Sequence, residues 1–163
     1  MEIFSLKNKN ILITGGAGLL GQKHVEAILI AEGNPIVLDN SKGNLDKLKK
    51  NISKNFNFNL DTHEVDITNE NEIKKIASQF KQNELNINGI INNAALNPTG
   101  KTLNQIETRV ENYSLKEWKN TLDVELTGSF LMLKHFGYLM SKQGLGGVIL
   151  NISSDLGLIS PDQ

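Results

Sequence analysis

Four glycines follow a short apolar run near the amino terminus, and their spacing suits the binding of a phosphate group. The apolar run, residues 11–13, predicts a strand, and residues 20–31 carry the apolar stripe of a helix. Glycines between a strand and a helix let the backbone turn tightly and approach a pyrophosphate, while the helix start supplies unpaired N–H groups. The sequence therefore predicts a dinucleotide site formed by Gly15, Gly18, Leu19, Leu20 and Gly21.

A second apolar run, residues 36–38, ends in Asp39, which lies eighteen residues after Gly21. A carboxylate at this place accepts hydrogen bonds from both ribose hydroxyls of an adenosine, and it repels a 2′-phosphate. Asp39 therefore predicts NAD as the preferred cofactor, with NADP as the alternative because Lys42 nearby would weaken the preference.

Short apolar runs alternate with helical stripes along the chain, which predicts a parallel sheet with helices on both faces. Right-handed crossovers then give an α/β fold of the Rossmann type, a doubly wound, three-layer αβα domain with strand order 3-2-1-4-5. Ligands of such sheets bind beyond the carboxyl ends of the strands, which is where the glycines, Asp39, Asn92 and Ser154 fall. The five strands are expected over residues 11–13, 36–38, 62–66, 87–91 and 148–152.

The other helices are expected from apolar periodicity and capping residues. The lysine-rich residues 45–54 predict an exposed helix, and Asn69 with Glu72 forms a capping box before the next helix. Ser114 opens a long helix that ends at the glycines from Gly144 onward. One apolar side of this helix is expected to face the interior, with Trp118 as a core residue. That side consists of Trp118, Leu122, Leu126, Leu133, Phe136 and Met140.

The composition excludes several classes of protein. The chain has 163 residues, 39% hydrophobic and 21% charged, so a single globular domain over residues 1–163 is expected. A net charge of −1 provides no basic field for nucleic acid or an anionic membrane, and no apolar run is long enough to span a bilayer. There are no cysteines, and the three histidines are too dispersed for a metal site. The expected partner is a small-molecule substrate, and the expected location is the cytoplasm.

Four short motifs each lie at the end of an expected strand. They are Thr14-Gly15-x-x-Gly18-x-x-Gly21, Asp66-Ile67, Asn92-Asn93-Ala94-Ala95 and Asn151-Ile-Ser-Ser154. In this order they are specific, and the whole chain resembles the short-chain dehydrogenase/reductase family. The resemblance implies that Asp66 and Ile67 flank the adenine ring, and that Asn92 stabilises the sheet beside the cofactor, with Ala94 in the same cofactor-binding stretch. It also implies that Ser154 hydrogen-bonds the carbonyl or hydroxyl oxygen of the substrate.

The chain departs from the usual motifs of that family at two places. The glycine spacing resembles the nucleotide-sugar epimerase branch, whereas residues 92–95 resemble the dehydrogenase branch. Residues 124–128 match the family's Val-Asn-x-x-Gly, and Glu125 stands where the resemblance implies an asparagine of the proton relay. Because Glu125 shares a helical face with Trp118 and Leu122, its side chain is expected to point inward, where an unpaired carboxylate is costly.

The resemblance implies that the general acid/base is a tyrosine in Tyr-x-x-x-Lys, shortly after the serine. Neither tyrosine nor lysine stands between Ser154 and Gln163, and Tyr113 and Tyr138 lie in other contexts. The chain is therefore expected to be the cofactor-binding part of a longer enzyme, truncated before strands 6 and 7 and inactive alone.

These patterns favour an NAD(P)-dependent oxidoreductase that interconverts a hydroxyl and a carbonyl, with Ser154 positioning the substrate oxygen. One alternative is a nucleotide-sugar epimerase or dehydratase, which the glycine spacing favours. Another is a non-catalytic dinucleotide-binding module, which Glu125 and the missing tyrosine favour. The tail from Ser153 resembles family members encoded with surface-glycan genes, which implies a sugar-type substrate. Apolar residues on the outer face of the long helix predict a homodimer or homotetramer, namely Leu131, Tyr138 and Leu139.

Overall fold

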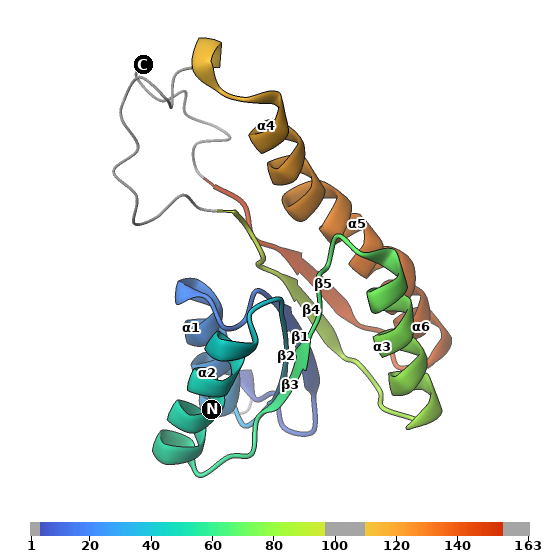
Figure 1. Ribbon diagram of the computed structural model, residues 1–163. Coiled ribbons are helices and arrows are strands. Elements are labelled where there is room, and N and C mark those ends of the chain that lie inside the picture. Colours follow the sequence, from blue (N-terminus) through green and yellow to red (C-terminus); the bar gives the residue numbers. More distant parts are fainter. Residues whose placement is uncertain (1–3, 97–109, 155–163) are drawn as a thin grey trace.

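Five parallel strands form one sheet in the computed structural model, in the order β3-β2-β1-β4-β5 (Figure 1). The structure describes residues 4–96 and 110–154. Because every neighbouring pair of these strands is parallel, the predicted strand order and the Rossmann-type fold class are confirmed. The strands are β1 (Asn10–Thr14), β2 (Asn34–Asp39), β3 (Asp61–Glu64), β4 (Gly89–Asn92) and β5 (Val148–Asn151).

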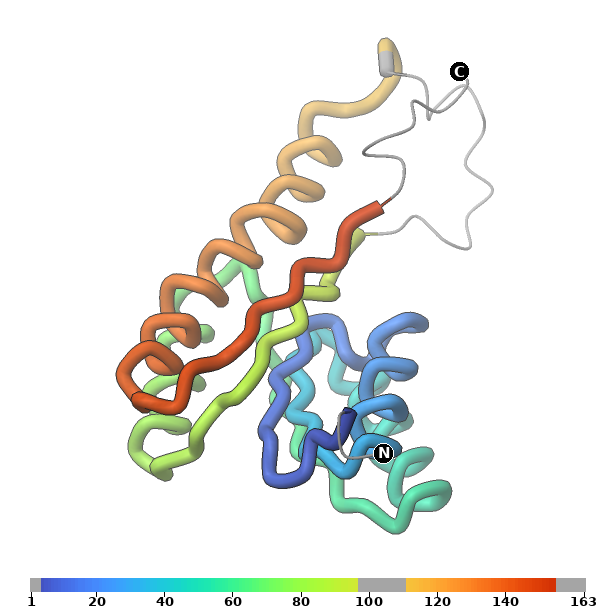
Figure 2. The backbone as a smooth tube through the Cα atoms, turned by 180° about the vertical axis from the view of Figure 1, so that it is seen from behind, coloured from blue at the N-terminus to red at the C-terminus, as the bar shows by residue number. Residues whose placement is uncertain are grey.

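Helices cover both faces of the sheet and make three layers (Figures 1 and 2). One face carries α1 (Leu19–Ile30) and α2 (Lys42–Phe56). The other face carries α3 (Glu70–Gln82) and a long helix that follows the short turn η2 (Val110–Asn112). The long helix has five consecutive segments, of which η3 and η4 are π-helical: α4 (Leu115–Leu122), η3 (Asp123–Thr127), α5 (Gly128–Met132), η4 (Leu133–Gly137) and α6 (Tyr138–Lys142).

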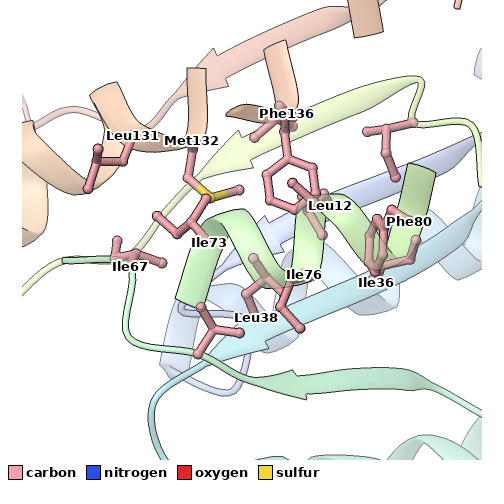
Figure 3. Close-up of a cluster of buried hydrophobic side chains, with 14 of the residues drawn as sticks. Leu12, Ile36, Leu38, Ile67, Ile73, Ile76, Phe80, Leu131, Met132 and Phe136 are labelled. Atoms are coloured by element: carbon pink, nitrogen blue, oxygen red, sulfur yellow. The ribbon is translucent and has the colours of Figure 1, made fainter. Parts of the chain in front are cut away.

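Each face of the sheet has its own hydrophobic core. Beneath α3 and the long helix, Leu12 of β1 lies among buried side chains that include Phe80 and Phe136 (Figure 3). The two phenylalanine rings meet edge to face, with centroids 5.5 Å apart. Ile13, the next residue of β1, points to the opposite face and belongs to the core beneath α1 and α2. The central strand is therefore apolar on both faces, as a parallel sheet covered by two helical layers requires.

Side-chain caps define the starts of α3 and the long helix. Ser114 Oγ accepts a hydrogen bond from the Glu117 N–H at 3.1 Å and donates to Glu117 Oε2 at 2.7 Å. Asn69 Oδ1 accepts from the Asn71 N–H at 3.1 Å, and its amide donates to Glu72 Oε1 at 2.8 Å. Both helix starts expected from the capping residues are confirmed.

The lysine-rich helix α2 is less exposed than its sequence predicts. Leu45, Leu48 and Ile52 share one side and are at most 4% exposed. These three side chains pack in the core beneath α1 and α2, while the lysines of the helix face solvent. The prediction of an exposed helix was therefore wrong for its inner side, because widely spaced leucines suffice to dock an otherwise charged helix.

The predicted inner side of the long helix was also wrong. Trp118 is 54% exposed and Leu126 66% exposed, whereas Phe136 is fully buried, so Trp118 is not a core residue. The cause is the π-helical geometry of η3 and η4, because each such stretch makes the helix rotate less per residue. Over the five residues of one stretch, the rotation lags by about 90° behind that of an α-helix, so the two stretches together lag by about half a turn. A residue before η3 and a residue after η4 would share a face in a regular α-helix. In this helix they lie on opposite sides.

The same lag changes the composition of the outer face. Leu131 was expected there, but it is only 6% exposed and belongs to the core. Leu139 packs against the core, and of the three predicted residues only Tyr138 is exposed, at 60%. The exposed apolar side chains of the long helix are instead Leu115, Trp118, Leu122, Leu126, Phe130, Leu133 and Tyr138.

Candidate functional site

The carboxyl ends of the strands lie at one edge of the sheet, where the strand order reverses. Successive strands step from β1 to β2 and β3 on one side, and β4 and β5 then extend the sheet on the other side of β1. The switch point between β1 and β4 is where open α/β sheets bind ligands. Residues 15–21 follow β1, residues 93–94 follow β4, and Ser154 follows β5, so the structure brings these predicted site residues to the same edge.

The loop between β1 and α1, together with the first turn of α1, leaves no room for side chains at Gly15 and Gly21. Gly15 has φ +61°, a left-handed conformation that side chains disfavour. A Cβ on Gly21 would lie 2.6 Å from Gly16 Cα, which is closer than non-bonded atoms approach. Gly15 and Gly21 therefore have a steric cause in this fold.

The start of α1 presents backbone N–H groups in an arrangement that suits an anion. Gly18 precedes the helix, no side-chain cap bonds to it, and the first turn contains no acidic residue. The first hydrogen bond inside the helix runs from the Gln22 N–H to Gly18 O at 3.1 Å. The N–H groups of Leu19 and Leu20 therefore precede the helical ladder, at the positive end of the helix dipole, where a phosphate is stabilised.

Asp39, the last residue of β2, is in direct contact with this glycine loop. It is 9% exposed, and its Oδ2 accepts a hydrogen bond from the Ala17 N–H at 3.1 Å. Its Oδ1 accepts from the Ser41 N–H at 2.9 Å. A carboxylate has further lone pairs beyond these two bonds, so Asp39 retains the capacity to accept hydroxyl groups.

Thr14 and Asn93, to which the sequence patterns assigned no role, join the glycine loop to the loop after β4. Thr14 is 1% exposed, and its Oγ1 accepts from the N–H groups of Asn93 at 3.0 Å and Ala94 at 3.1 Å. Asn93 Nδ2 donates to Thr14 O and Gly15 O, both at 3.1 Å. A Cβ on Gly15 would lie 2.8 Å from Ala94 Cα, so the two loops touch. The sequence signal that could have indicated this contact is that the glycine motif follows β1 and the Asn92-Asn93 motif ends β4, and these two strands are parallel neighbours.

Asn92 ties β4 to β5 beside the same edge. It is 5% exposed, pairs in register with Asn151, and donates from Nδ2 to Asn151 Oδ1 at 2.7 Å. The ladder continues one residue further, because the Ile152 N–H donates to Asn92 O at 2.9 Å. Ser154 follows two residues later and is exposed at this edge of the sheet.

Asp66 and Ile67, which follow β3, occupy different environments. Asp66 is exposed, and its Oδ1 accepts from the N–H and the hydroxyl of Thr68 at 2.9 and 2.8 Å. Ile67 is 7% exposed, and a Cβ on Gly128 would lie 2.6 Å from its Cδ1. The Ile67 side chain is thus part of the core under α5, whereas Asp66 lies at the surface.

Glu125 lies in η3, and its side chain is exposed rather than directed inward. The expectation of a buried carboxylate was wrong because the whole face that Glu125 shares with Trp118 and Leu122 is exposed. The Ser129 hydroxyl donates to Glu125 O at 2.8 Å, which satisfies a backbone carbonyl of the π-helical stretch.

An ionic cluster connects the start of α3 to η4. Glu70 Oε1 lies 2.8 Å from His135 Nε2, 2.9 Å from Lys134 Nζ and 3.6 Å from Lys74 Nζ. The hydrogen bonds from Lys134 and then His135 lower the pKa of Glu70 from 4.5 to about 2. This cluster fastens the second π-helical stretch to the neighbouring helix and lies outside the predicted site.

The spacing Tyr-x-x-x-Lys does occur once in the sequence, at Tyr138–Lys142, before the serine rather than after it. These two residues lie on α6, with Lys142 Nζ 5.3 Å from the centre of the Tyr138 ring. Because α6 precedes β5 and Ser154 follows it, the length of β5, about 13 Å, separates the end of α6 from the residues next to the serine. Tyr138 therefore does not belong to the predicted site, in agreement with its sequence context.

Within the described ranges, no cluster of three or more His, Cys, Asp or Glu side chains is arranged to hold a metal ion. The helices of residues 4–96 and 110–154 include none that is long and apolar enough to cross a membrane. A doubly wound parallel sheet with a glycine loop at its switch point defines a Rossmann-type domain. The model of the short chain dehydrogenase family matches residues 9–162, and the chain belongs to that family.

Named relatives agree with this membership. The chain is 27% identical over 155 residues to 2,5-dichloro-2,5-cyclohexadiene-1,4-diol dehydrogenase of Sphingobium indicum, a match that covers 94% of the chain and 57% of the relative. It is 26% identical over 153 residues to a probable NADP-dependent mannitol dehydrogenase of Yarrowia lipolytica, covering 94% and 52%. The crystal structure of a short chain dehydrogenase from Leptospira borgpetersenii with bound NAD+ is similar, with a TM-score of 0.81, 28% identity, and coverage of 98% and 56%. The chain thus spans less than two thirds of the length of these proteins.

Proposed function

We propose that the protein carrying this chain is an NAD(P)-dependent oxidoreductase that interconverts a hydroxyl and a carbonyl group. The observation that carries the proposal is the contact between Asp39 and the Ala17 N–H, which places a carboxylate beside an uncapped helix start. The named relatives are dehydrogenases, and this favours redox chemistry over a nucleotide-sugar epimerase or dehydratase and over a non-catalytic module.

The residues around the glycine loop fit a dinucleotide. Gly21 keeps side-chain atoms away from the loop, and the N–H groups of Leu19 and Leu20 would hold the pyrophosphate. Asp39 would accept the ribose hydroxyls of the adenosine, and its charge favours NAD over NADP. When bound, the nicotinamide supplies a carbon that accepts or returns a hydride. Asp66 is proposed at the adenine edge.

Two further positions complete the proposed cofactor contacts. The Ile67 side chain is buried and packs under α5. We therefore propose that Ile67 supports the adenine-binding region from within the core and does not form an exposed surface for the ring. Ala94 is proposed beside the cofactor because its loop touches Gly15. Asn92 would keep β4 and β5 in register there through its bond to Asn151.

On the substrate side, Ser154 would hydrogen-bond the oxygen that changes between hydroxyl and carbonyl. It follows β5 directly, and the register between β4 and β5 fixes where that strand ends. The proposed substrate is a small polyhydroxylated molecule of the sugar-alcohol or diol type. The support comes from relatives named for a cyclic diol and for mannitol.

Calorimetric titration of the full-length protein with NAD and NADP tests the cofactor assignment. NAD should bind more tightly, and a panel of sugar alcohols and diols should then produce the absorbance of reduced nicotinamide. Failure to bind either cofactor would exclude the proposed function, whereas equal or tighter binding of NADP would exclude only the preference assigned to Asp39.

We also propose that the protein assembles as a homodimer or homotetramer. Large exposed side chains along the long helix support this, for example Leu126 and Phe130, which are 66% and 56% exposed. Light scattering at micromolar concentration should give a mass above that of one chain. Phe130→Glu should shift the protein toward the monomer, whereas Gln79→Glu on the exposed side of α3 should not. A monomeric parent protein would contradict the proposal.

Residues 1–163 are proposed to be one cofactor-binding domain that does not turn over substrate by itself. The basis is that Tyr138, in the single Tyr-x-x-x-Lys of the sequence, lies far from Ser154. NAD-dependent turnover by a purified polypeptide of 18.0 kDa would refute this. A cytoplasmic location is proposed because the chain has no cysteine, and cell fractionation would test it.

A further inference from the structure

The backbone of Ala17, in the middle of the glycine loop, is held by side chains on both of its polar groups. Asp39 Oδ2 accepts the Ala17 N–H at 3.1 Å, and Gln22 Nε2 donates to Ala17 O at 3.0 Å. Ala17 is 3% exposed and Asp39 9% exposed, so the bond to the carboxylate is shielded from water. Asp39 comes from the end of β2 and Gln22 from the first turn of α1.

We infer that Asp39 and Gln22 are positioning residues that form a loop clamp, which holds the glycine loop in its anion-binding shape for NAD and NADP alike. The inference rests on the proposed cofactor-binding function and adds a role that ribose recognition does not require. Gln22 thus acquires a role in holding Ala17 O, and Asp39 acquires a role in holding the Ala17 N–H in addition to its proposed contact with the ribose.

The loop needs such restraint because glycines lose more conformational freedom on ordering than other residues. Within the loop, the Gly18 N–H donates to Gly15 O at 3.1 Å. From outside the loop, Leu38 O of β2 accepts the Gly16 N–H at 3.4 Å, and Asn93 Nδ2 donates to Gly15 O at 3.1 Å. A bond to an ionised carboxylate is about twice as strong as a neutral one. The loop clamp therefore supplies the strongest external restraint on residues 15–18.

The loop clamp also connects the two halves of the proposed cofactor contact. Gln22 is fixed to the helix through its own N–H, which donates to Gly18 O at 3.1 Å. Its side chain then holds Ala17 O against the same helical turn that presents the N–H groups of Leu19 and Leu20. The distance between the Asp39 carboxylate and these N–H groups is thereby fixed before any ligand binds.

The loop clamp makes a prediction opposite to that of a simple charge filter. If Asp39 only selected the ribose, Asp39→Ala would weaken NAD binding and strengthen NADP binding. With the loop clamp, Asp39→Ala weakens both, because the Ala17 N–H loses its acceptor. Asp39→Asn keeps an oxygen that accepts this N–H and removes the charge, so it retains NADP binding that Asp39→Ala loses.

The experiment compares the full-length protein with Asp39→Ala, Asp39→Asn, Gln22→Ala and Gln22→Met by titration with NAD, NADP and adenosine. Adenosine lacks the pyrophosphate, and Gln22→Met keeps the side-chain length while removing the donor. Both Gln22 variants should bind NAD and NADP about tenfold more weakly. Their affinity for adenosine should change less than about twofold. Gln79→Ala, an exposed change on α3, should alter none of these values.

Hydrogen exchange of the Ala17 amide provides a readout that is independent of ligand binding. The exchange should be faster in Asp39→Ala than in the parent protein, and Asp39→Asn should restore slow exchange. Unchanged NAD and NADP affinities in both Gln22 variants, or tighter NADP binding by Asp39→Ala, would overturn the loop clamp. A loss that extends equally to adenosine would also overturn it. If the parent protein bound neither cofactor, the proposed function would fail, while unchanged Ala17 exchange would separately refute the loop clamp.

Discussion

Thr14→Val removes one hydroxyl, with little change in side-chain shape, where the glycine loop meets the loop after β4. Thr14 is 1% exposed, and its Oγ1 accepts the N–H groups of Asn93 at 3.0 Å and Ala94 at 3.1 Å. Valine offers no acceptor, so both N–H groups would lose their partner. The Asn93 side-chain bonds to Thr14 O and Gly15 O would then hold the two loops together without this backbone contact.

The expected loss of stability follows from the number of donors that lose their partner. A buried N–H without an acceptor costs about 1–3 kcal/mol. Asn93 and Ala94 are half-buried, so partial hydration places each group in the lower part of that range. The sum for both donors is about 2–4 kcal/mol in the free energy of unfolding. For a domain of this size, each kcal/mol lowers Tm by about 2–4 °C.

Urea unfolding of the full-length protein measures this loss, with Thr14→Ser as the control. Serine keeps the hydroxyl and loses one methyl group, which costs about 1 kcal/mol. Thr14→Val should therefore be the less stable variant, and its NAD affinity should fall because the loop beside Gly15 is less well held. A Thr14→Val protein as stable as Thr14→Ser would refute the inference that the hydroxyl joins the two loops.

Three other substitutions probe the site and its surroundings. In Gly21→Ala, the added Cβ would lie 2.6 Å from Gly16 Cα, so calorimetry should show NAD binding weakened more than tenfold. Unchanged NAD binding would contradict this steric argument. Hydrogen bonds keep the pKa of Glu70 at about 2, below its ordinary 4.5, so its stabilising contribution is present above about pH 4.5 and is lost as the pH falls toward 2. Glu70→Gln should accordingly lower Tm at neutral pH and have little effect near pH 2, and an equal shift at both would exclude the ion pairs as its cause. Glu125→Asn should retain or raise activity, change its pH profile and leave cofactor affinity unaltered, whereas a large loss of activity would show that Glu125 has a role of its own.

The sheet could be predicted from the sequence because its signals are local. Consecutive apolar residues such as Leu12 and Ile13 predict a strand buried on both faces, and the structure places them in different cores. The strand order then follows from the right-handed crossovers between parallel strands, which leave few alternatives. For the same reason, the carboxyl edge of the sheet could be predicted as the ligand-binding edge before any distance was known.

The orientation of the long helix could not be predicted in this way. A regular period of 3.6 residues puts Trp118 and Phe136 on one side, and this extrapolation holds only if every turn is α-helical. The π-helical stretch η3 and the part of η4 that precedes Phe136 turn these residues away from each other, so Phe136 is buried and Trp118 is 54% exposed. Glu125 was placed inward by the same extrapolation, and its exposure follows from the same geometry.

The contacts that hold the glycine loop were missed for a different reason, although Asp39 itself was predicted as a cofactor-binding residue. Thr14 is separated from Asn93 by 79 residues, and Asp39 from Ala17 by 22, so neither contact has a periodic signature in the sequence. In both of these hydrogen bonds the donor is a backbone N–H, which every residue type except proline carries, so the residue type at Asn93 or Ala17 does not indicate the contact. The glycines indicate where the backbone must turn. The conformation of that turn is held by side chains from the ends of neighbouring strands and helices. A substitution at Thr14 or Gln22 should therefore affect a phosphate site that neither residue need touch.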